Sequence, residues 1–309
     1  MLQAVLADFR SWGRVHILTT LDYRLSGISL TADRIIRLRH EEYFGTIDDI
    51  LAKSDAALII APESDAILSR LTALAEYAGV QLLGASSDGA TIAANKWECS
   101  RRFTENGLPT PDTWRSNFAQ AAMDAKKYGF PLVIKPIDGA GCEAVSLASD
   151  ISSLKLAFEQ TNLVHKDFLL QRYIAGMHAS VSILVSANRV LSLSLNRQLI
   201  KIGNAFVYQG ALVPLQHPQR RRALELARRA VSLVPGLRGY VGVDMILTDE
   251  ECYLIEINPR ITSSYIALRQ VININLAEAI WRSCRENSLP KNIFISGKAS
   301  FCKEELSVI

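Results

Sequence analysis

Residues 253–260 read YLIEINPR and place a polar side chain at every second position of an otherwise apolar strand. The polar residues are Glu256, Asn258 and Arg260. Side chains alternate between the two faces of a strand, so these three are predicted to share one face while Ile255 and Ile257 point to the other. Pro259 closes the strand. The pattern indicates a functional polar row built on a half-buried strand.

The preceding strand is predicted to place a further carboxylate opposite the polar row. Residues 242–258, GVDMILTDEECYLIEIN, contain two strand-like runs separated by three acidic residues, which is a hairpin signal. If the turn centres on Glu250, Asp244 lies directly opposite Glu256, and facing like charges are destabilising unless one is protonated or a cation lies between them. The Asn258 amide would add a third oxygen. Such ligands suit Mg²⁺, with Mn²⁺ as a substitute, although a solvent-facing hairpin with ordinary surface acids also fits the spacing.

Composition limits the class of protein. The 309 residues are 49% apolar, enough for two or three packed lobes, and the net charge of +3 does not favour nucleic acid or a membrane as a partner. The sequence has no run of about 18 apolar residues, which a membrane span requires. The five cysteines are scattered without a C-x-x-C pair, which is typical of reduced thiols in a cytoplasmic protein.

Hydrophobic periodicity predicts a mixed α/β (α+β) chain in three parts. They are an N-terminal α/β domain at 1–92, a central subdomain with a glycine lid loop at 93–175, and a C-terminal subdomain with the metal site at 176–309. The expected strands include 15–20, 56–62 and 81–85, and antiparallel strands are expected within 179–200 and within 239–258. The expected helices include 66–79, a single helix over 91–107, 150–160, 220–234 and a segment from about Tyr265.

A glycine-rich loop follows the strand that ends at Lys135. Its sequence at 136–142, PIDGAGC, allows backbone N–H groups to approach phosphate oxygens closely. Residues 139–144 fit the G-x-G-x-x-A dinucleotide pattern, but a strand follows where that fingerprint requires a helix. No P-loop sequence occurs. The loop is therefore interpreted as a lid over a nucleotide, or as a hairpin that binds nothing.

Several motifs together resemble the ATP-grasp carboxylate–amine ligases. They are Lys135 with DGAGC, the strand LLQRYIAG (169–176), Asp244, and IEINPRITSSYIAL (255–268), and the resemblance runs from about Lys96 to Arg269. Within this family the motifs are most similar to the branch that joins tyramine to L-glutamate in methanofuran biosynthesis. They are also similar to the branch that joins lysine to methylornithine in pyrrolysine synthesis. The resemblance implies an ATP-grasp fold, ATP with Mg²⁺, small-molecule acid and amine substrates, and an acyl-phosphate intermediate.

The resemblance also implies roles for individual residues. Those that would bind ATP are Lys96, Lys135, Asp138, Gly139, Gly141, Gln171, Arg172, Tyr173 and Ile174. The magnesium ligands would be Asp244, Glu256 and Asn258. Arg260 would be catalytic, because a planar guanidinium suits the transferred phosphate or the substrate carboxylate. Taken alone, Lys96 also fits a solvated helix lysine, and Arg260 also fits one partner of a salt bridge at a strand end.

Two departures from the family pattern carry expectations of their own. His178 stands near the position where many members have an acid that contacts the ribose. The chain also opens with the helix MLQAVLADFRSWG, so either the N-terminal lobe lacks its first strand or the sequence starts late, and a partner or a second subunit, in a homodimer, would cover the exposed edge. These departures keep open a catalytically weakened ATP-binding scaffold. The basic helix RRRALELARRA has an apolar stripe opposite its arginines and is interpreted as a solvated face, not a nucleic-acid site.

Overall fold

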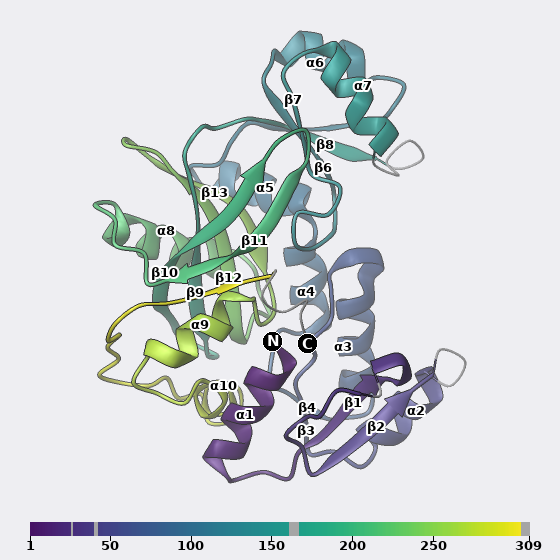
Figure 1. The fold of residues 1–309 in the computed structure, drawn as a ribbon, viewed down its shortest axis with the longest axis vertical. Helices are drawn as coiled ribbons and strands as arrows, with labels where there is room; N and C mark the ends of the chain where they lie inside the picture. Colours follow the sequence, from purple (N-terminus) through teal and green to yellow (C-terminus); the bar gives the residue numbers. More distant parts are fainter. Residues whose placement is uncertain (26, 40–42, 161–166, 304–309) are drawn as a thin grey trace.

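A computed structural model describes residues 1–25, 27–39, 43–160 and 167–303. Figure 1 shows an upper lobe, a large antiparallel sheet below it, and an N-terminal lobe at the lower right. The mixed α/β class predicted from the sequence is confirmed.

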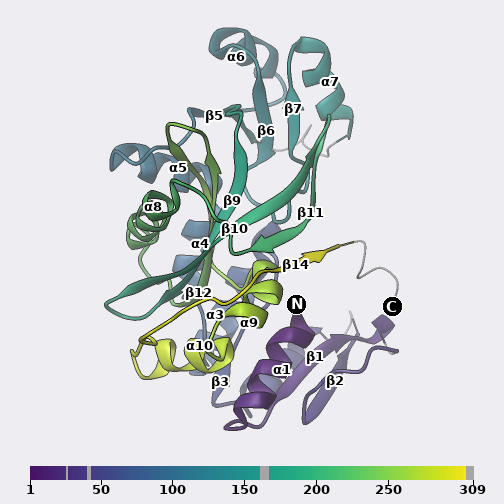
Figure 2. The ribbon, with the colours of Figure 1, turned by 60° about the vertical axis from the view of Figure 1, so that its left-hand side comes forward.

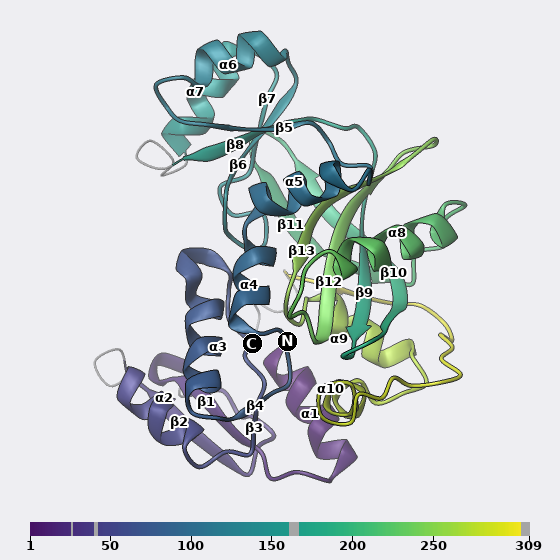
Figure 3. The ribbon, with the colours of Figure 1, turned by 180° about the vertical axis from the view of Figure 1, so that it is seen from behind.

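The large sheet has six strands in the order β13-β12-β9-β10-β11-β14, and neighbouring strands are antiparallel. Its strands are β9 (Met177–Val185), β10 (Val190–Ile202), β11 (Phe206–Val213), β12 (Gly239–Leu247), β13 (Cys252–Asn258) and β14 (Ala299–Cys302). The helices that cover it are α4 (Ser87–Ala94), α5 (Lys96–Glu105), α8 (Arg220–Ser232), α9 (Ser264–Val271) and α10 (Leu276–Arg285). Figure 3 shows α4, α5 and α8 on one face, where they close a core with β9, β12 and β13. The opposite face packs on α9 and α10 in a second core.

The upper lobe has a sheet and a core of its own. Its strand order is β5-β8-β6-β7. The elements are β5 (Thr113–Ser116), α6 (Ala121–Tyr128), β6 (Leu132–Pro136), β7 (Ser146–Ala148), α7 (Ile151–Gln160) and β8 (Phe168–Arg172). Two strands joined by the glycine loop were expected, and β6 and β7 pair antiparallel on either side of it. Figure 2 shows this lobe standing above the long strands β9, β10 and β11.

The N-terminal lobe contains two short parallel strand pairs, β1 with β2 and β3 with β4. Its elements are α1 (Leu2–Trp12), β1 (Leu18–Asp22), η1 (Tyr23–Leu25), β2 (Arg34–Leu38), α2 (Tyr43–Leu51), β3 (Ala56–Ala57), η3 (Ser64–Ala66), α3 (Ile67–Tyr77) and β4 (Gln81–Leu82). The strand expected over 56–62 is thus much shorter than its apolar run. The segment after it turns towards the rest of the molecule and includes η3.

The single helix expected over 91–107 is wrong in one respect, because it is broken at Asn95. Asn95 is extended (φ −83°, ψ 99°), and its side chain accepts a hydrogen bond from the backbone N–H of Glu98. An asparagine followed three residues later by a glutamate is a helix start signal, so α5 begins afresh at Lys96. The break brings Lys96 to the first turn of α5, next to the glycine loop.

The predicted hairpin forms, with one irregularity that changes which side chains share a face. Asp244 faces Glu256 as expected, but on the turn side Met245 pairs with Leu254, so one extra residue lies in β13 as a β-bulge. The expectation that Ile255 points away from the polar row is therefore wrong. At a bulge two consecutive side chains oppose one partner residue, and Ile255 joins Glu256 in lining the same cavity.

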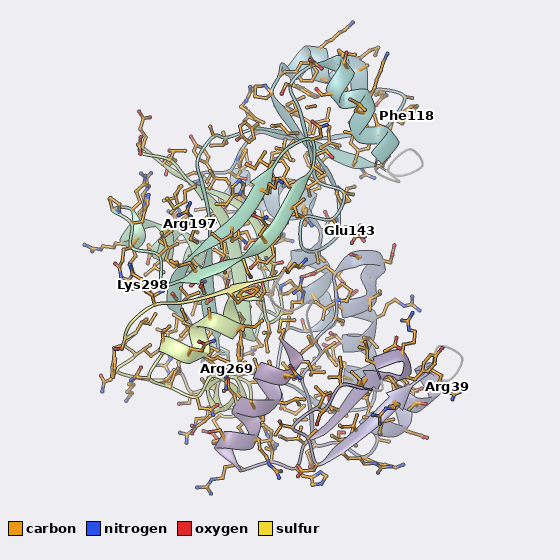
Figure 4. All side chains as sticks on the ribbon, in the orientation of Figure 1. Arg39, Phe118, Glu143, Arg197, Arg269 and Lys298 are labelled. Atoms are coloured by element: carbon orange, nitrogen blue, oxygen red, sulfur yellow. The ribbon has the colours of Figure 1, made fainter. Side chains whose placement is uncertain are left out.

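Helix α1 is joined to the large sheet's second core by a buried polar network centred on Asp8. The Tyr265 hydroxyl donates to Asp8 Oδ2 at 2.6 Å, and the Arg269 guanidinium donates twice to Oδ1, at 2.9 and 2.6 Å. The Asn275 side chain donates to the Asp8 carbonyl at 2.8 Å. Figure 4 shows Arg269 where α9 meets α1. The network joins residues far apart in the chain.

The basic helix α8 buries an apolar stripe, as expected, although Leu224 lies at its edge and the buried residues are Ala223, Leu226, Ala227, Ala230 and Val231. Among the described helices none is long and apolar enough to cross a membrane.

Candidate functional site

The predicted site residues meet at a cavity between the upper sheet and the large sheet. Its lining includes Lys96, Lys135, Gly139, Gly141, Gln171, Arg172, Tyr173, Ile174, Asp244 and Glu256. Strands β6 and β8 and the glycine loop close the cavity from above, and β9 to β13 form the opposite wall. Figure 4 shows Glu143, which directly follows the glycine loop, between the upper lobe and α3 and α4. Three of the residues predicted from the sequence are not part of this lining: Asp138, Asn258 and Arg260.

The pKa values of the two facing carboxyl groups are shifted in opposite directions. Burial, followed by the charge of Glu256, raises the pKa of Asp244 to about 7, although the amides of Gln198 and Asn258 donate to it and oppose the shift. Burial alone would raise the pKa of Glu256, but the charges of Lys96 and Lys135 outweigh it and lower that pKa. The pair therefore combines an ionised Glu256 with an Asp244 that holds a proton up to neutral pH.

The two lysines approach this pair from different elements. The Lys96 ammonium lies 3.4 Å from Glu256 Oε2 and donates to the Gly139 carbonyl at 2.7 Å. The Lys135 ammonium is buried and donates to Gln171 Oε1 at 3.0 Å. Burial lowers the pKa of Lys135 to about 8, with Glu256 opposing that shift and Lys96 adding to it. A polyanion bound here would contact the Lys96 and Lys135 ammonium groups. It would also lie next to the backbone of the glycine loop, which the glycines leave accessible.

The segment from Gln171 to Ile174 forms one end of the cavity, as expected. Gln171 is buried, accepting from Lys135 and donating to the Thr113 hydroxyl at 2.8 Å. The Arg172 guanidinium is held at the cavity's edge by Asp112, at 3.2 Å. His178 also lines the cavity, and burial lowers its pKa, so it presents a neutral imidazole where an acid was expected from the family pattern.

Asp138 and Arg260 face the N-terminal lobe. The Asp138 carboxylate accepts a hydrogen bond from the backbone N–H of Asp65 at 3.0 Å. The Arg260 guanidinium donates to Glu63 Oε2 at 2.8 Å, which is the salt bridge at a strand end left open from the sequence. In this structure, therefore, both residues have protein partners. ATP contact by Asp138 and phosphate contact by Arg260 remain predictions.

Sequence reasoning missed part of the cavity wall. Gln198 and Ile200 of β10, Phe206 of β11, and Met245 and Ile246 of β12 all contribute to the lining. They belong to the strand-like runs already recognised, but alternation alone did not separate the cavity face from the core face. Gln198 had a usable signal, because an amide in a long apolar strand requires a partner, and here that partner is Asp244.

The donor set fits a hard divalent cation. Asp244 and Glu256 face each other directly, and Asn258 donates to Asp244. Within the described ranges no group of three or more His, Cys, Asp or Glu gathers at a metal-ligand spacing, so the protein would supply two carboxylates and one amide oxygen here. Mg²⁺ commonly takes few protein ligands and retains water or substrate phosphate oxygens. Burial raises the pKa of Asp244, the charge of Glu256 raises it further, and a cation held between the two carboxylates would oppose both effects.

The raised pKa of Asp244 predicts a pH-dependent stability. The folded state holds this proton up to a pH of about 7, whereas the ordinary pKa of an aspartate is 3.8, so the stabilisation is present at low pH and is lost as pH rises through about 7. Between pH 5.5 and 7.5, in EDTA, we expect the loss of this proton to lower the unfolding free energy of the wild type by about 2 kcal/mol relative to a variant without it.

Asp244→Asn should remove this slope, and Asp249→Asn in the exposed turn should retain it, as measured by urea unfolding. Lys135, whose pKa is lowered to about 8, makes the unfolding free energy rise with pH, but mainly near and above pH 8. Most of its effect therefore falls outside the range from pH 5.5 to 7.5. An equal slope in wild type and Asp244→Asn would contradict the proton on Asp244.

Comparisons with known proteins agree with this geometry. Residues 93–264 match the ATP-grasp domain family, and residues 15–89 match the pre ATP-grasp 3 domain family. The tyramine–L-glutamate ligase of Methanocaldococcus jannaschii is 32% identical over 292 residues, which cover 94% of this chain and 83% of that relative.

Two solved structures share the fold. An ATP-grasp superfamily protein from Archaeoglobus fulgidus is 26% identical with a TM-score of 0.69, over 97% of this chain and 89% of that one. The biotin carboxylase domain of 2-oxoglutarate carboxylase from Hydrogenobacter thermophilus, solved with MgADP and bicarbonate, has a TM-score of 0.81 at 17% identity, over 97% and 72% of the two chains. The second likeness shows the fold alone.

Proposed function

Since this chain belongs to the ATP-grasp family, as an ATP-dependent carboxylate–amine ligase, we propose that it joins L-glutamate to tyramine. The observation that carries the choice of substrates is the relationship to the Methanocaldococcus jannaschii enzyme along 94% of the chain. The reaction would serve methanofuran biosynthesis, as the sequence resemblance implies.

In the proposed reaction, a glutamate carboxylate attacks the γ-phosphate of ATP to form an acyl phosphate and ADP. The amine of tyramine then attacks the acyl carbon, the amide bond forms, and inorganic phosphate leaves with the loss of the amine proton to water. Phosphoryl transfer requires positioning and charge neutralisation more than a protein nucleophile. The cavity supports this chemistry because Lys96 and Lys135 approach the glycine loop and Glu256 from two sides.

The residues suited to hold a cation are Asp244, Glu256 and Asn258. When bound, Mg²⁺ would neutralise charge on the phosphate oxygens during transfer. Lys96 and Lys135 would hold the same oxygens from the protein side, and Gln171, Arg172, Tyr173 and Ile174 would line the nucleoside end. The glycine loop would cover the phosphates, with Gly139 (φ 127°) and Gly141 (φ 67°) in conformations that favour glycine.

The test is ADP release by the purified protein with ATP, Mg²⁺, L-glutamate and tyramine, with mass spectrometry of the product. We expect ADP in step with a product of the mass of glutamate plus tyramine minus water, and neither without the acid or the amine. ADP release that is indifferent to tyramine would reject this amine. Activity with lysine and methylornithine would instead favour the pyrrolysine-type reaction, and nucleotide binding without turnover with any acid–amine pair would favour a scaffold.

A further inference from the structure

A buried ion pair connects the N-terminal lobe to the end of β13, the strand that carries the proposed metal ligands. Glu63 is 3% exposed, and its Oε2 lies 2.8 Å from Arg260 Nη2, whose side chain is 14% exposed. The two residues are 197 positions apart in the chain. Removing a pair of charges from water is costly, and replacing such a pair by apolar residues is often neutral or stabilising. Stability alone is therefore a weak reason for the pair.

The pair is only half satisfied. Arg260 Nη1 donates to the Ile261 carbonyl at 3.2 Å, but Arg260 Nε has no acceptor and Glu63 Oε1 has no donor among the residues that the structure describes. A guanidinium and a carboxylate can form two parallel hydrogen bonds, and this pair forms one. Buried polar atoms without partners cost free energy. The pair therefore does not make the largest possible number of hydrogen bonds, and what its geometry provides is a fixed orientation of the guanidinium.

The backbone that carries Glu63 is also unusual. Asp65 (φ 52°) and Ala66 (φ 57°) adopt left-handed conformations one after the other, which non-glycine residues rarely do. Such conformations persist where the surroundings enforce them and cluster at functional sites. The Asp65 N–H donates to Asp138 of the glycine loop. One short segment therefore contacts both the loop above the cavity and the arginine at the end of the polar row.

On the basis of the proposed ligase function, we propose that Glu63 is a positioning residue that orients the Arg260 guanidinium for the transferred phosphate. Glu63 acts through Arg260 and does not itself touch a substrate. A guanidinium is a rigid fork of donors, so fixing one prong aims the others. Donors that are oriented before the charge develops stabilise a transition state without reorganisation at the moment of reaction.

The first test requires no acid or amine substrate. In protein labelled with ¹⁵N-arginine, the Arg260 guanidinium resonances are identified by their loss in Arg260→Lys. We expect restricted rotation of this guanidinium in the wild type and faster rotation in Glu63→Gln. Glu76→Gln, which alters an exposed glutamate bonded to Ser87, is the control and should leave it restricted. Equal restriction in wild type and Glu63→Gln would overturn the proposal.

The second test is a double-mutant cycle on ADP release. Glu63→Gln should lower kcat about 10-fold and change the KM for ATP less than 2-fold, and Glu63→Asp, which keeps the charge, should recover part of the loss. In an Arg260→Ala background, Glu63→Gln should cause no further loss. Additive losses would mean that Glu63 acts independently of Arg260, and the proposal would fail. If Glu63→Gln does not fold, Glu63→Asp replaces it in both tests, with a smaller loss expected.

The two tests separate this inference from the proposed substrates. A wild type that is inactive with glutamate and tyramine would reject those substrates, while the arginine resonances would still decide whether Glu63 orients Arg260. The cycle would then be run with whichever acid and amine support ADP release.

Discussion

Replacing Glu256 by glutamine should lower kcat/KM for ADP formation at least about 100-fold, or by about 3 kcal/mol of transition-state stabilisation. Glu256 is the ionised member of the facing carboxylates and lies 3.4 Å from the Lys96 ammonium. Glutamine keeps the shape but removes the charge that a cation would need. It also leaves Lys96 and Lys135 without their shared counter-charge, so the pKa of Lys135 should fall further and its phosphate contact should weaken.

The fold should survive this change, because glutamine keeps the volume and hydrogen-bonding capacity of glutamate, and Lys135, whose pKa is already lowered to about 8, can release its proton when the counter-charge is removed. A melting temperature within a few degrees of the wild type would establish that the loss is catalytic. The matched control is Glu251→Gln, just before β13, where the carboxylate pairs with Arg222 away from the cavity. This control should retain activity within about 2-fold, as for a surface ion pair. Turnover of Glu256→Gln within 3-fold of the wild type would disprove the metal assignment.

The second large effect concerns stability. Asp8→Ala should lower the unfolding free energy by about 3 kcal/mol, measured by urea unfolding at pH 7. The Asp8 side chain is 9% exposed and accepts hydrogen bonds from Tyr265 and Arg269. Its loss leaves a fully buried tyrosine hydroxyl and a partly buried guanidinium without their acceptor, and unpaired buried donors are expensive.

The control for Asp8→Ala is an ion pair on the surface. Glu105 pairs with Arg101 along α5, with both side chains about half exposed, at 53% and 45%. Glu105→Gln should change the unfolding free energy by less than about 0.5 kcal/mol, because exposed helix pairs contribute little. If Asp8→Ala costs less than 1 kcal/mol, α1 does not depend on this network for its place against α9.

The hairpin that carries the carboxylates was predictable because its signals are local. Acidic turn residues lie between two strand-like runs, and a turn centred on Glu250 predicts Asp244 opposite Glu256. The observed ladder begins with Leu247 opposite Cys252, which is not centred on Glu250, and the bulge at Ile255 restores the predicted pairing.

The start of α5 was missed although its signal was present, since Asn95 and Glu98 form a capping pair within an apparently continuous helical pattern. The prediction gave more weight to the helical periodicity of the whole segment than to the capping signal within it.

Long-range contacts had no comparable signal. Nothing near Arg260 in sequence indicates Glu63, and nothing near Asp138 indicates that its carboxylate accepts from Asp65. Both contacts depend on how the N-terminal lobe packs against the rest of the chain. A strand-forming run such as 56–62 likewise does not reveal that only Ala56 and Ala57 will find a pairing partner. Local propensity identifies elements, whereas packing assigns their partners.

The bulge in β13 has a consequence for how this hairpin can tolerate changes in length. On the turn side of the bulge Met245 pairs with Leu254, and the next pair is Asp244 with Glu256. Ile255 lies between these two pairs without a partner of its own, so it is the extra residue. A chain without Ile255 would form an uninterrupted ladder and would still bring Asp244 and Glu256 face to face. What it would lose is one aliphatic wall of the cavity proposed to bind the nucleotide. Ile255 thus adds an apolar side chain to the cavity wall beside Glu256, while Asp244 and Glu256 still face each other.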